Sequence, residues 1–136
     1  MREPAATPNS GIGEPLRQSA KSEVIIVSPF IGKRRLPRML HILAAAINNG
    51  AKITVITRPE ADYKETDRLS VREMADRIRN CGINLVFKAN IHQKFAVIDQ
   101  RIVWYGSINL LSFGSSEESI MRLDSINIAN ELAGTI

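Results

Sequence analysis

Hydrophobic residues along the chain gather in short runs that alternate with segments of helical periodicity. Residues 22–31 and 51–57 are continuous apolar stretches rich in β-branched side chains, typical of strands buried on both faces. Between them, apolar residues recur at helical spacing after Pro37, which is tolerated in the first turn of a helix. Asn49 and Gly50 favour the end of that helix. The pattern therefore predicts a strand, a helix and a second strand.

The same alternation continues along the chain. Residues 59–69 are polar and irregular, which predicts a loop. Ser70 and Glu73 match a capping box, so a second helix is expected to begin there and to end near Gly82. Residues 83–89 predict a third strand. Right-handed crossovers between these strands predict an α/β fold with a mixed, mostly parallel central sheet and helices on both faces.

Two further apolar runs predict a β-hairpin. Residues 95–99 and 102–107 are rich in β-branched and aromatic residues and are separated by the polar residues 100–101. A two-residue turn would place Lys94 opposite Ser107, whereas a three-residue loop would shift the register by one. Residues 125–134 then predict a terminal helix.

Polar side chains cluster at the open end of this hairpin. With a two-residue turn, His92 would face Asn109 and Lys94 would face Ser107, while Gly106 would let a ligand approach the backbone. An ammonium, an amide and a hydroxyl suit an anion with several oxygens. His92 is the side chain of this set that can attack or transfer protons near neutral pH. The cluster predicts a site for a phosphodiester.

This stretch resembles the HKD motif of the phospholipase D superfamily. Every defining position is present, as His92, Lys94, Asp99, Gly106, Ser107 and Asn109. The predicted order of elements also resembles the half-molecule layout of that superfamily, so the resemblance covers roughly residues 22 to 136. It implies a phospholipase D-like half-domain whose terminal hairpin carries the motif.

The resemblance also implies a mechanism. Members of the superfamily pair two motifs, and one histidine attacks phosphorus to form a phosphohistidine while the other protonates the leaving oxygen. Lys94 and Asn109 would stabilise the charge, so neither a metal nor a cofactor is implied. Asp99 or Glu118 would orient the imidazole, and Glu117 is the alternative to Glu118.

Because this sequence carries one motif, two copies are expected to share a site. We predict a homodimer with a two-fold axis near His92. The substrate would be bound by Lys94, Gly106, Ser107 and Asn109.

Composition describes an ordinary globular chain. Its 136 residues suit one domain at 22–136, preceded by a Pro-rich flexible tail or linker at 1–21. Cys81 alone excludes an internal disulfide. The sequence shows no signal-peptide pattern and no apolar run long enough to span a bilayer, so we expect a cytoplasmic protein without stable membrane association.

The net charge of +4 favours a polyanionic partner, with nucleic acid as the first expectation. Basic residues outside the motif lie in two predicted loops, namely Lys33, Arg34 and Arg35 in one and Arg58, Lys64 and Arg68 in the other. His41 falls off the apolar stripe of its helix and is expected to be an exposed bystander. Trp104 and Tyr105 are expected to point to opposite faces of the hairpin and to belong to the core.

Taken together, these features predict a phosphodiesterase of the nuclease type that acts on DNA or RNA. Two other functions remain open on the sequence. One is a phospholipase D-type lipid phosphodiesterase. The other is a non-catalytic, dimerising nucleic-acid-binding module of a larger helicase- or ATPase-linked protein.

Overall fold

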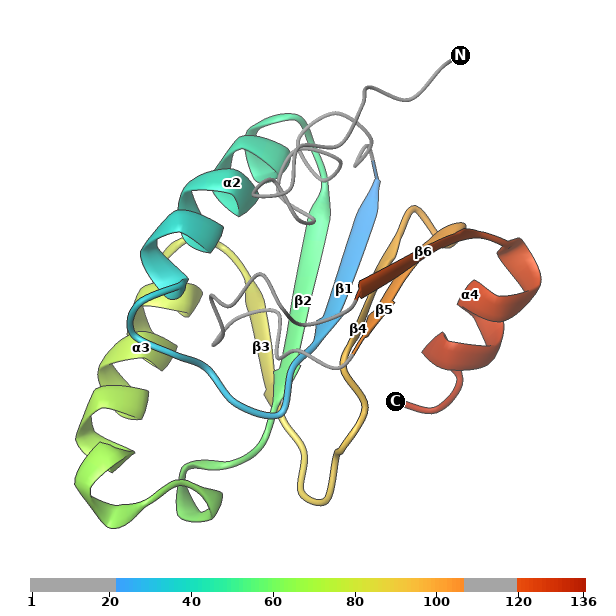
Figure 1. Cartoon of the computed structure of the whole chain (residues 1–136). Helices are drawn as coiled ribbons and strands as arrows, with labels where there is room; N and C mark the ends of the chain where they lie inside the picture. Colours follow the sequence, from blue (N-terminus) through green and yellow to red (C-terminus); the bar gives the residue numbers. More distant parts are fainter. Residues whose placement is uncertain (1–21, 107–119) are drawn as a thin grey trace.

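The structure is a computed structural model that describes residues 22–106 and 120–136 (Figure 1). The tail predicted at residues 1–21 lies outside the described residues. The elements follow the chain as β1 (Glu23–Val27), α2 (Leu36–Asn48), β2 (Lys52–Thr57), the short 3-10 helices η1 (Glu60–Asp62) and η2 (Glu65–Asp67), α3 (Arg68–Asn80), β3 (Asn84–Phe87), β4 (Phe95–Ile98), β5 (Ile102–Gly106), β6 (Ile120–Asp124) and α4 (Ile126–Ala133).

The strands of the described residues form one sheet in the order β3-β2-β1-β4-β5-β6. Strands β1, β2 and β3 run parallel, as two strand–helix–strand crossovers require. Strand β4 is antiparallel to β1, and β5 and β6 continue the sheet as antiparallel neighbours. The predicted α/β class is confirmed, and the sheet is mixed, with a parallel half and an antiparallel half.

Helices cover both faces of the sheet, as predicted. Helices α2 and α3 lie on one face and α4 lies on the other (Figure 1). Because side chains alternate along each strand, Val24 and Ile26 of β1 join the larger core under α2 and α3, whereas Val27 joins a smaller core with Phe95 and Ala129 of α4. All five of these side chains are buried.

The helix ends agree with the sequence signals at all but one position. Helix α2 has Pro37 in its first turn and is followed by Gly50 at a φ of 95°. The capping box expected at Ser70 is wrong, because α3 begins at Arg68. The chain enters α3 directly from η2, so Ser70 already lies inside the helix. Helix α4 does have a capped start, where Ser125 Oγ accepts a hydrogen bond from the Ile128 N–H at 3.2 Å.

The predicted hairpin forms, but its register differs by one residue. Ile98 pairs with Ile102, so the loop holds three residues, and Asp99 and Gln100 adopt left-handed φ values of 53° and 57°. Lys94 consequently lies opposite Gly106, whose N–H donates to the Lys94 carbonyl at 3.2 Å, and not opposite Ser107. The longer loop shifts every cross-strand partner of the hairpin by one position.

Asp99 ties the hairpin loop to the start of β1. Its Oδ1 accepts hydrogen bonds from the Ser22 N–H at 2.9 Å, the Ser22 hydroxyl at 3.1 Å and the Glu23 N–H at 3.1 Å. The Asp99 N–H in turn donates to the Glu23 carbonyl at 2.8 Å. The carboxylate therefore satisfies backbone donors at the beginning of the strand that occupies the middle of the sheet.

Replacement of Asp99 by alanine should lower the free energy of unfolding by about 2 kcal/mol, because three hydrogen bonds to a carboxylate are lost and alanine disfavours a left-handed φ. Asp99→Asn keeps an acceptor and tolerates that φ, so its loss should be smaller. Urea denaturation of both variants measures the difference. Equal stability of wild type and Asp99→Ala would contradict this role.

Candidate functional site

One edge of the sheet gathers several of the residues that the sequence singled out, His92 and Lys94 among them. In the central strands, Val27 at the end of β1 pairs with both Ile56 of β2 and Phe95 at the start of β4. The carboxyl ends of the parallel strands and the amino end of β4 therefore meet at this edge, which we call the carboxyl edge. The residues immediately beyond these strand ends are Ser28, Arg58, Lys88 and Lys94, and β5 ends at the same edge with Gly106. Open α/β sheets commonly bind ligands at such an edge.

His92 lies at the carboxyl edge in direct contact with Arg58. The Arg58 Nη2 lies 2.7 Å from His92 Nδ1, and Arg58 Nε donates to the Ile91 carbonyl at 2.8 Å. One guanidinium thus holds both the histidine ring and the backbone beside it. His92 is exposed and Arg58 is half-buried, so the contact is open to a ligand from solvent.

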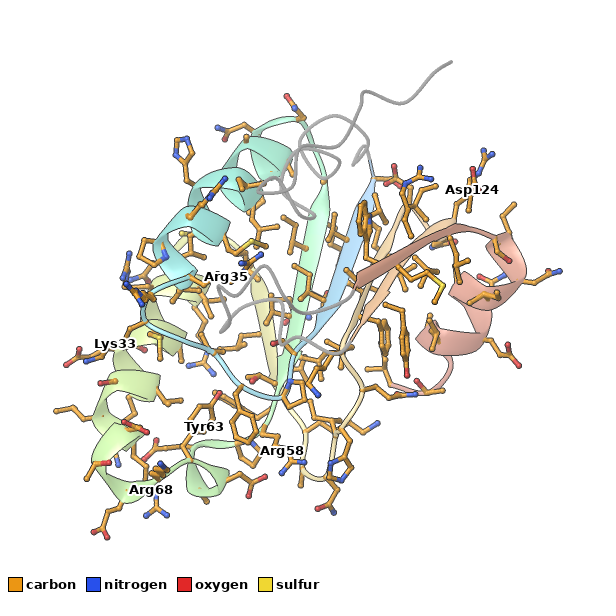
Figure 2. All side chains as sticks on the ribbon, viewed as in Figure 1. Lys33, Arg35, Arg58, Tyr63, Arg68 and Asp124 are labelled. Carbon is orange, nitrogen blue, oxygen red and sulfur yellow. The ribbon has the colours of Figure 1, made fainter. Side chains whose placement is uncertain are left out.

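The rings of Phe30 and Tyr63 form an aromatic platform that supports Arg58. Its guanidinium carbon lies 5.3 Å from the centroid of the Phe30 ring, within the range of a cation–π interaction. The Phe30 ring meets Tyr63 edge to face, with centroids 5.1 Å apart. Figure 2 shows Arg58 and Tyr63 close together at this end of the sheet, with Asp124 at the opposite end.

The Tyr63 hydroxyl is fully used in holding the platform. It accepts from the Ile31 N–H at 2.8 Å and lies 3.3 Å from Thr57 Oγ1. Since Thr57 gives its own proton to the Pro29 carbonyl at 3.0 Å, Tyr63 must be the donor to Thr57. Burial raises the pKa of Tyr63, so the hydroxyl remains protonated at neutral pH.

The loop that carries His92 is fastened to both neighbouring parts of the fold. The Lys88 N–H donates to the Thr57 carbonyl at 2.8 Å, which extends the pairing of β2 and β3. The Lys88 ammonium donates to the Thr135 carbonyl at 3.1 Å, and the Thr135 hydroxyl lies 3.4 Å from Gln93 Oε1. The segment after α4 therefore braces the histidine loop on one side, while Arg58 braces it on the other.

Lys94 is half-buried at the mouth of the hairpin. Its carbonyl pairs with Gly106, and its ammonium makes no hydrogen bond or ion pair with any residue that the structure describes. His92, Lys94 and Gly106 therefore lie at one edge as expected. Ser107, Asn109, Glu117 and Glu118 lie outside the described residues, so their placement remains a prediction.

Asp99 does not join this cluster. It follows β4, whereas His92 precedes it, so the whole length of the strand separates the two residues. Its carboxylate bonds to Ser22 and Glu23 at the far edge of the sheet. The expectation that Asp99 orients the imidazole is therefore wrong, since its contacts assign it to the hairpin loop.

The other basic residues of the two predicted loops lie in different places and have different contacts. Figure 2 shows Lys33 and Arg35 beside the start of α2, well away from Arg58. Arg68 donates to the backbone carbonyls of Ala61 and Tyr63 at 3.2 and 3.3 Å and so supports the loop after β2. Among the described residues, Arg58 contacts the motif histidine directly, at His92 Nδ1.

The two aromatic residues of β5, both expected in the core, differ in burial. Trp104 is buried in the larger core, whereas Tyr105 is 39% exposed and stacks on Phe95 with ring centroids 6.3 Å apart. Cys81 is a free thiol packed against the larger core, and His41 is exposed on α2. Neither aromatic residue of β5 contacts His92 in the described structure.

Residues 22–106 and 120–136 contain no group of three or more histidine, cysteine or acidic side chains that could hold a metal ion. No helix in the same ranges combines the length and the hydrophobicity needed to cross a membrane.

Comparison with known proteins defines the family. Residues 16–135 match the family model described as "Cardiolipin synthase, PLD-like domain". The chain belongs to the phospholipase D superfamily. The match spans nearly the whole sequence, and its range includes the stretch from His92 to Asn109. A search of curated protein sequences found no match.

Solved structures share the fold of this phospholipase D-like chain. Nuc, a phospholipase D family member from Salmonella typhimurium, superimposes with a TM-score of 0.70 at 18% identity, covering 91% of this chain and 81% of Nuc. NucT from Helicobacter pylori gives 0.64 at 16% identity, with the same coverages of 91% and 81%. TrmBL2, an archaeal chromatin protein that binds DNA, gives 0.61 at 11% identity, covering 94% of this chain and 47% of TrmBL2.

Removing the Tyr63 hydroxyl should destabilise the platform beneath Arg58. Tyr63→Phe leaves the buried Ile31 N–H without its acceptor, so we expect a loss of about 1–3 kcal/mol in the free energy of unfolding. Tyr105→Phe is the matched control, because that ring is partly exposed and its hydroxyl bonds to no described residue. Chemical denaturation of the two variants tests this, and equal losses would contradict the role given to Tyr63.

Proposed function

We propose that this chain is a metal-independent phosphodiesterase that cleaves DNA or RNA through a phosphohistidine at His92, in a site shared by two copies. The observation that carries the proposal is the meeting of His92, Lys94 and Arg58 at the carboxyl edge, beside Gly106. A nucleophile is thereby surrounded by cations suited to a phosphate.

The reaction needs two imidazoles in different protonation states. A ring nitrogen of His92 in one copy would attack phosphorus, and the bond from phosphorus to the leaving oxygen would break as that oxygen takes a proton from His92 of the second copy. Water would then give its proton to that second histidine and attack the phosphohistidine, which releases the phosphate ester and restores both rings. Lys94, together with Asn109 and Ser107, would stabilise the charge on the phosphate oxygens.

Nucleic acid is the substrate class that several features favour. The net charge is +4, and Arg58, Lys88 and Lys94 all follow or precede strands at the edge that carries His92. The same fold occurs in TrmBL2, a chromatin protein that binds DNA.

Two other functions rest on particular comparisons. The description of the matching family model names cardiolipin synthase, a lipid enzyme, which supports a lipid phosphodiester as substrate. The likeness to TrmBL2 supports a module that binds DNA without cutting it. The three functions are separated by offering the protein labelled DNA, labelled RNA and anionic phospholipid vesicles in parallel.

Cleavage of labelled single- or double-stranded nucleic acid should persist in EDTA and should fall about 10³-fold or more in His92→Ala, because that ring both attacks and transfers protons. His41→Ala is the matched control, since His41 is the other histidine of the sequence and is exposed on α2. Activity that disappears with EDTA, or that survives His92→Ala, would refute the mechanism.

If two copies share one site, an inactive chain should also inactivate the active chain with which it pairs. Random pairing of wild type with His92→Ala at equal amounts would leave roughly a quarter of the dimers with two histidines, so activity per wild-type chain should fall about twofold. The two chains are refolded together and assayed beside a mixture with His41→Ala. Unchanged activity per wild-type chain, or a monomer at all concentrations in sedimentation, would exclude a homodimeric site.

A further inference from the structure

The contact between Arg58 and His92 determines where the imidazole carries its proton. A guanidinium has donors and no acceptor, so at 2.7 Å His92 Nδ1 must accept the hydrogen bond. A neutral ring that accepts at Nδ1 carries its proton on Nε2.

This tautomer is unsuited to attack on phosphorus. The nitrogen that faces away from Arg58 is Nε2, and with a proton attached it has no free electron pair. Attack from Nε2 requires the proton to lie on Nδ1, opposite an acceptor such as the carboxylate expected from Glu118 or Glu117. In the described structure Arg58 takes the position beside Nδ1 that such an acceptor would need.

The surroundings of Arg58 hold its guanidinium where a phosphate could also reach it. The Arg58 N–H donates to the Pro29 carbonyl at 3.1 Å, and the Phe30 ring lies under the guanidinium. These anchors act on the backbone and the flat face, and the Arg58 Nε is held by the Ile91 carbonyl, so the terminal nitrogens Nη1 and Nη2 are the donors that a phosphate could bind. Arginine binds phosphate through two parallel hydrogen bonds, which are stronger than a hydrogen bond to a neutral imidazole.

We propose that Arg58 is a positioning residue that keeps His92 in its non-attacking tautomer in the free protein and releases Nδ1 when its guanidinium binds a substrate phosphate. The inference rests on the proposed function, since the phosphate belongs to the phosphodiester to be cleaved. In this step the N–H bond at Nε2 breaks and an N–H bond at Nδ1 forms, with solvent water accepting and returning the proton, since His92 is exposed. Arg58 exchanges one acceptor for another, and no bond to phosphorus changes.

The sequence has two histidines, so replacing His41 leaves His92 as the single source of ring-nitrogen signals in a ¹⁵N NMR spectrum. In protein labelled with ¹⁵N-histidine and carrying His41→Gln, the single remaining ring belongs to His92. For the neutral ring we expect the pattern of protonation at Nε2. Titration with inorganic phosphate should shift this pattern toward a ring protonated at Nδ1. This measurement is made on protein in which Arg58 is intact.

Arg58→Met tests the cause, because methionine keeps an unbranched stem over Phe30 and removes every donor. We expect a mixture of both tautomers in the free variant and no further change with phosphate. The matched control is Arg101→Ala, which removes an arginine at the opposite edge, where it is paired with Asp124. That variant should keep the wild-type pattern. In cleavage assays Arg58→Met should raise KM about tenfold or more, since a charge-assisted contact to phosphate is lost.

A wild-type ring protonated at Nδ1 without phosphate, or identical ring-nitrogen shifts in wild type and Arg58→Met, would overturn the inference. In that case cleavage that depends on His92 would still support the proposed function, without the role given to Arg58. Conversely, a tautomer shift with phosphate in a protein that cleaves neither nucleic acid nor lipid would remove the proposed function and leave the role of Arg58 intact.

Discussion

The antiparallel pairing of β4 with β1 is the constraint on which the site depends. Strands β1, β2 and β3 alone would form a parallel sheet whose carboxyl ends carry Ser28, Arg58 and Lys88. Because β4 enters beside β1 in the opposite direction, its amino end reaches that same edge. His92 and Lys94 precede β4 and are therefore delivered to the residues that follow the parallel strands. A parallel fourth strand would place them at the far edge.

Side chains outside the motif hold the residues of the carboxyl edge in place. Tyr63 bonds to Ile31 and Thr57, Phe30 packs on Tyr63, and Arg58 stacks on Phe30. These contacts are buried or half-buried, so they restrict the position of a guanidinium that contacts an exposed histidine. The proposed phosphodiester cleavage would need such rigid support of the histidine, because catalysis of phosphoryl transfer rests mainly on positioning and electrostatics.

The fold and most of the element order could be predicted from the sequence. Continuous apolar runs such as residues 51–57 identify buried strands, and Pro37 and Gly50 mark the limits of α2. These signals are local, since they depend on periodicity, on φ preferences and on the missing N–H of proline. The motif residues at 92 and 94 were likewise visible from their spacing, and their location at a strand end followed from the predicted hairpin.

Other features were decided by tertiary structure alone. The hairpin register depends on a three-residue loop in which Asp99 and Gln100, with no glycine to signal it, take left-handed φ values because the Asp99 carboxylate binds the start of β1. Arg58 and His92 are 34 residues apart, and nothing in either local sequence indicates that they touch. The sequence by itself determined most of the elements and the spacing of the motif residues. Pairing between distant strands decided which side chains meet, because that pairing depends on the packing of the whole sheet.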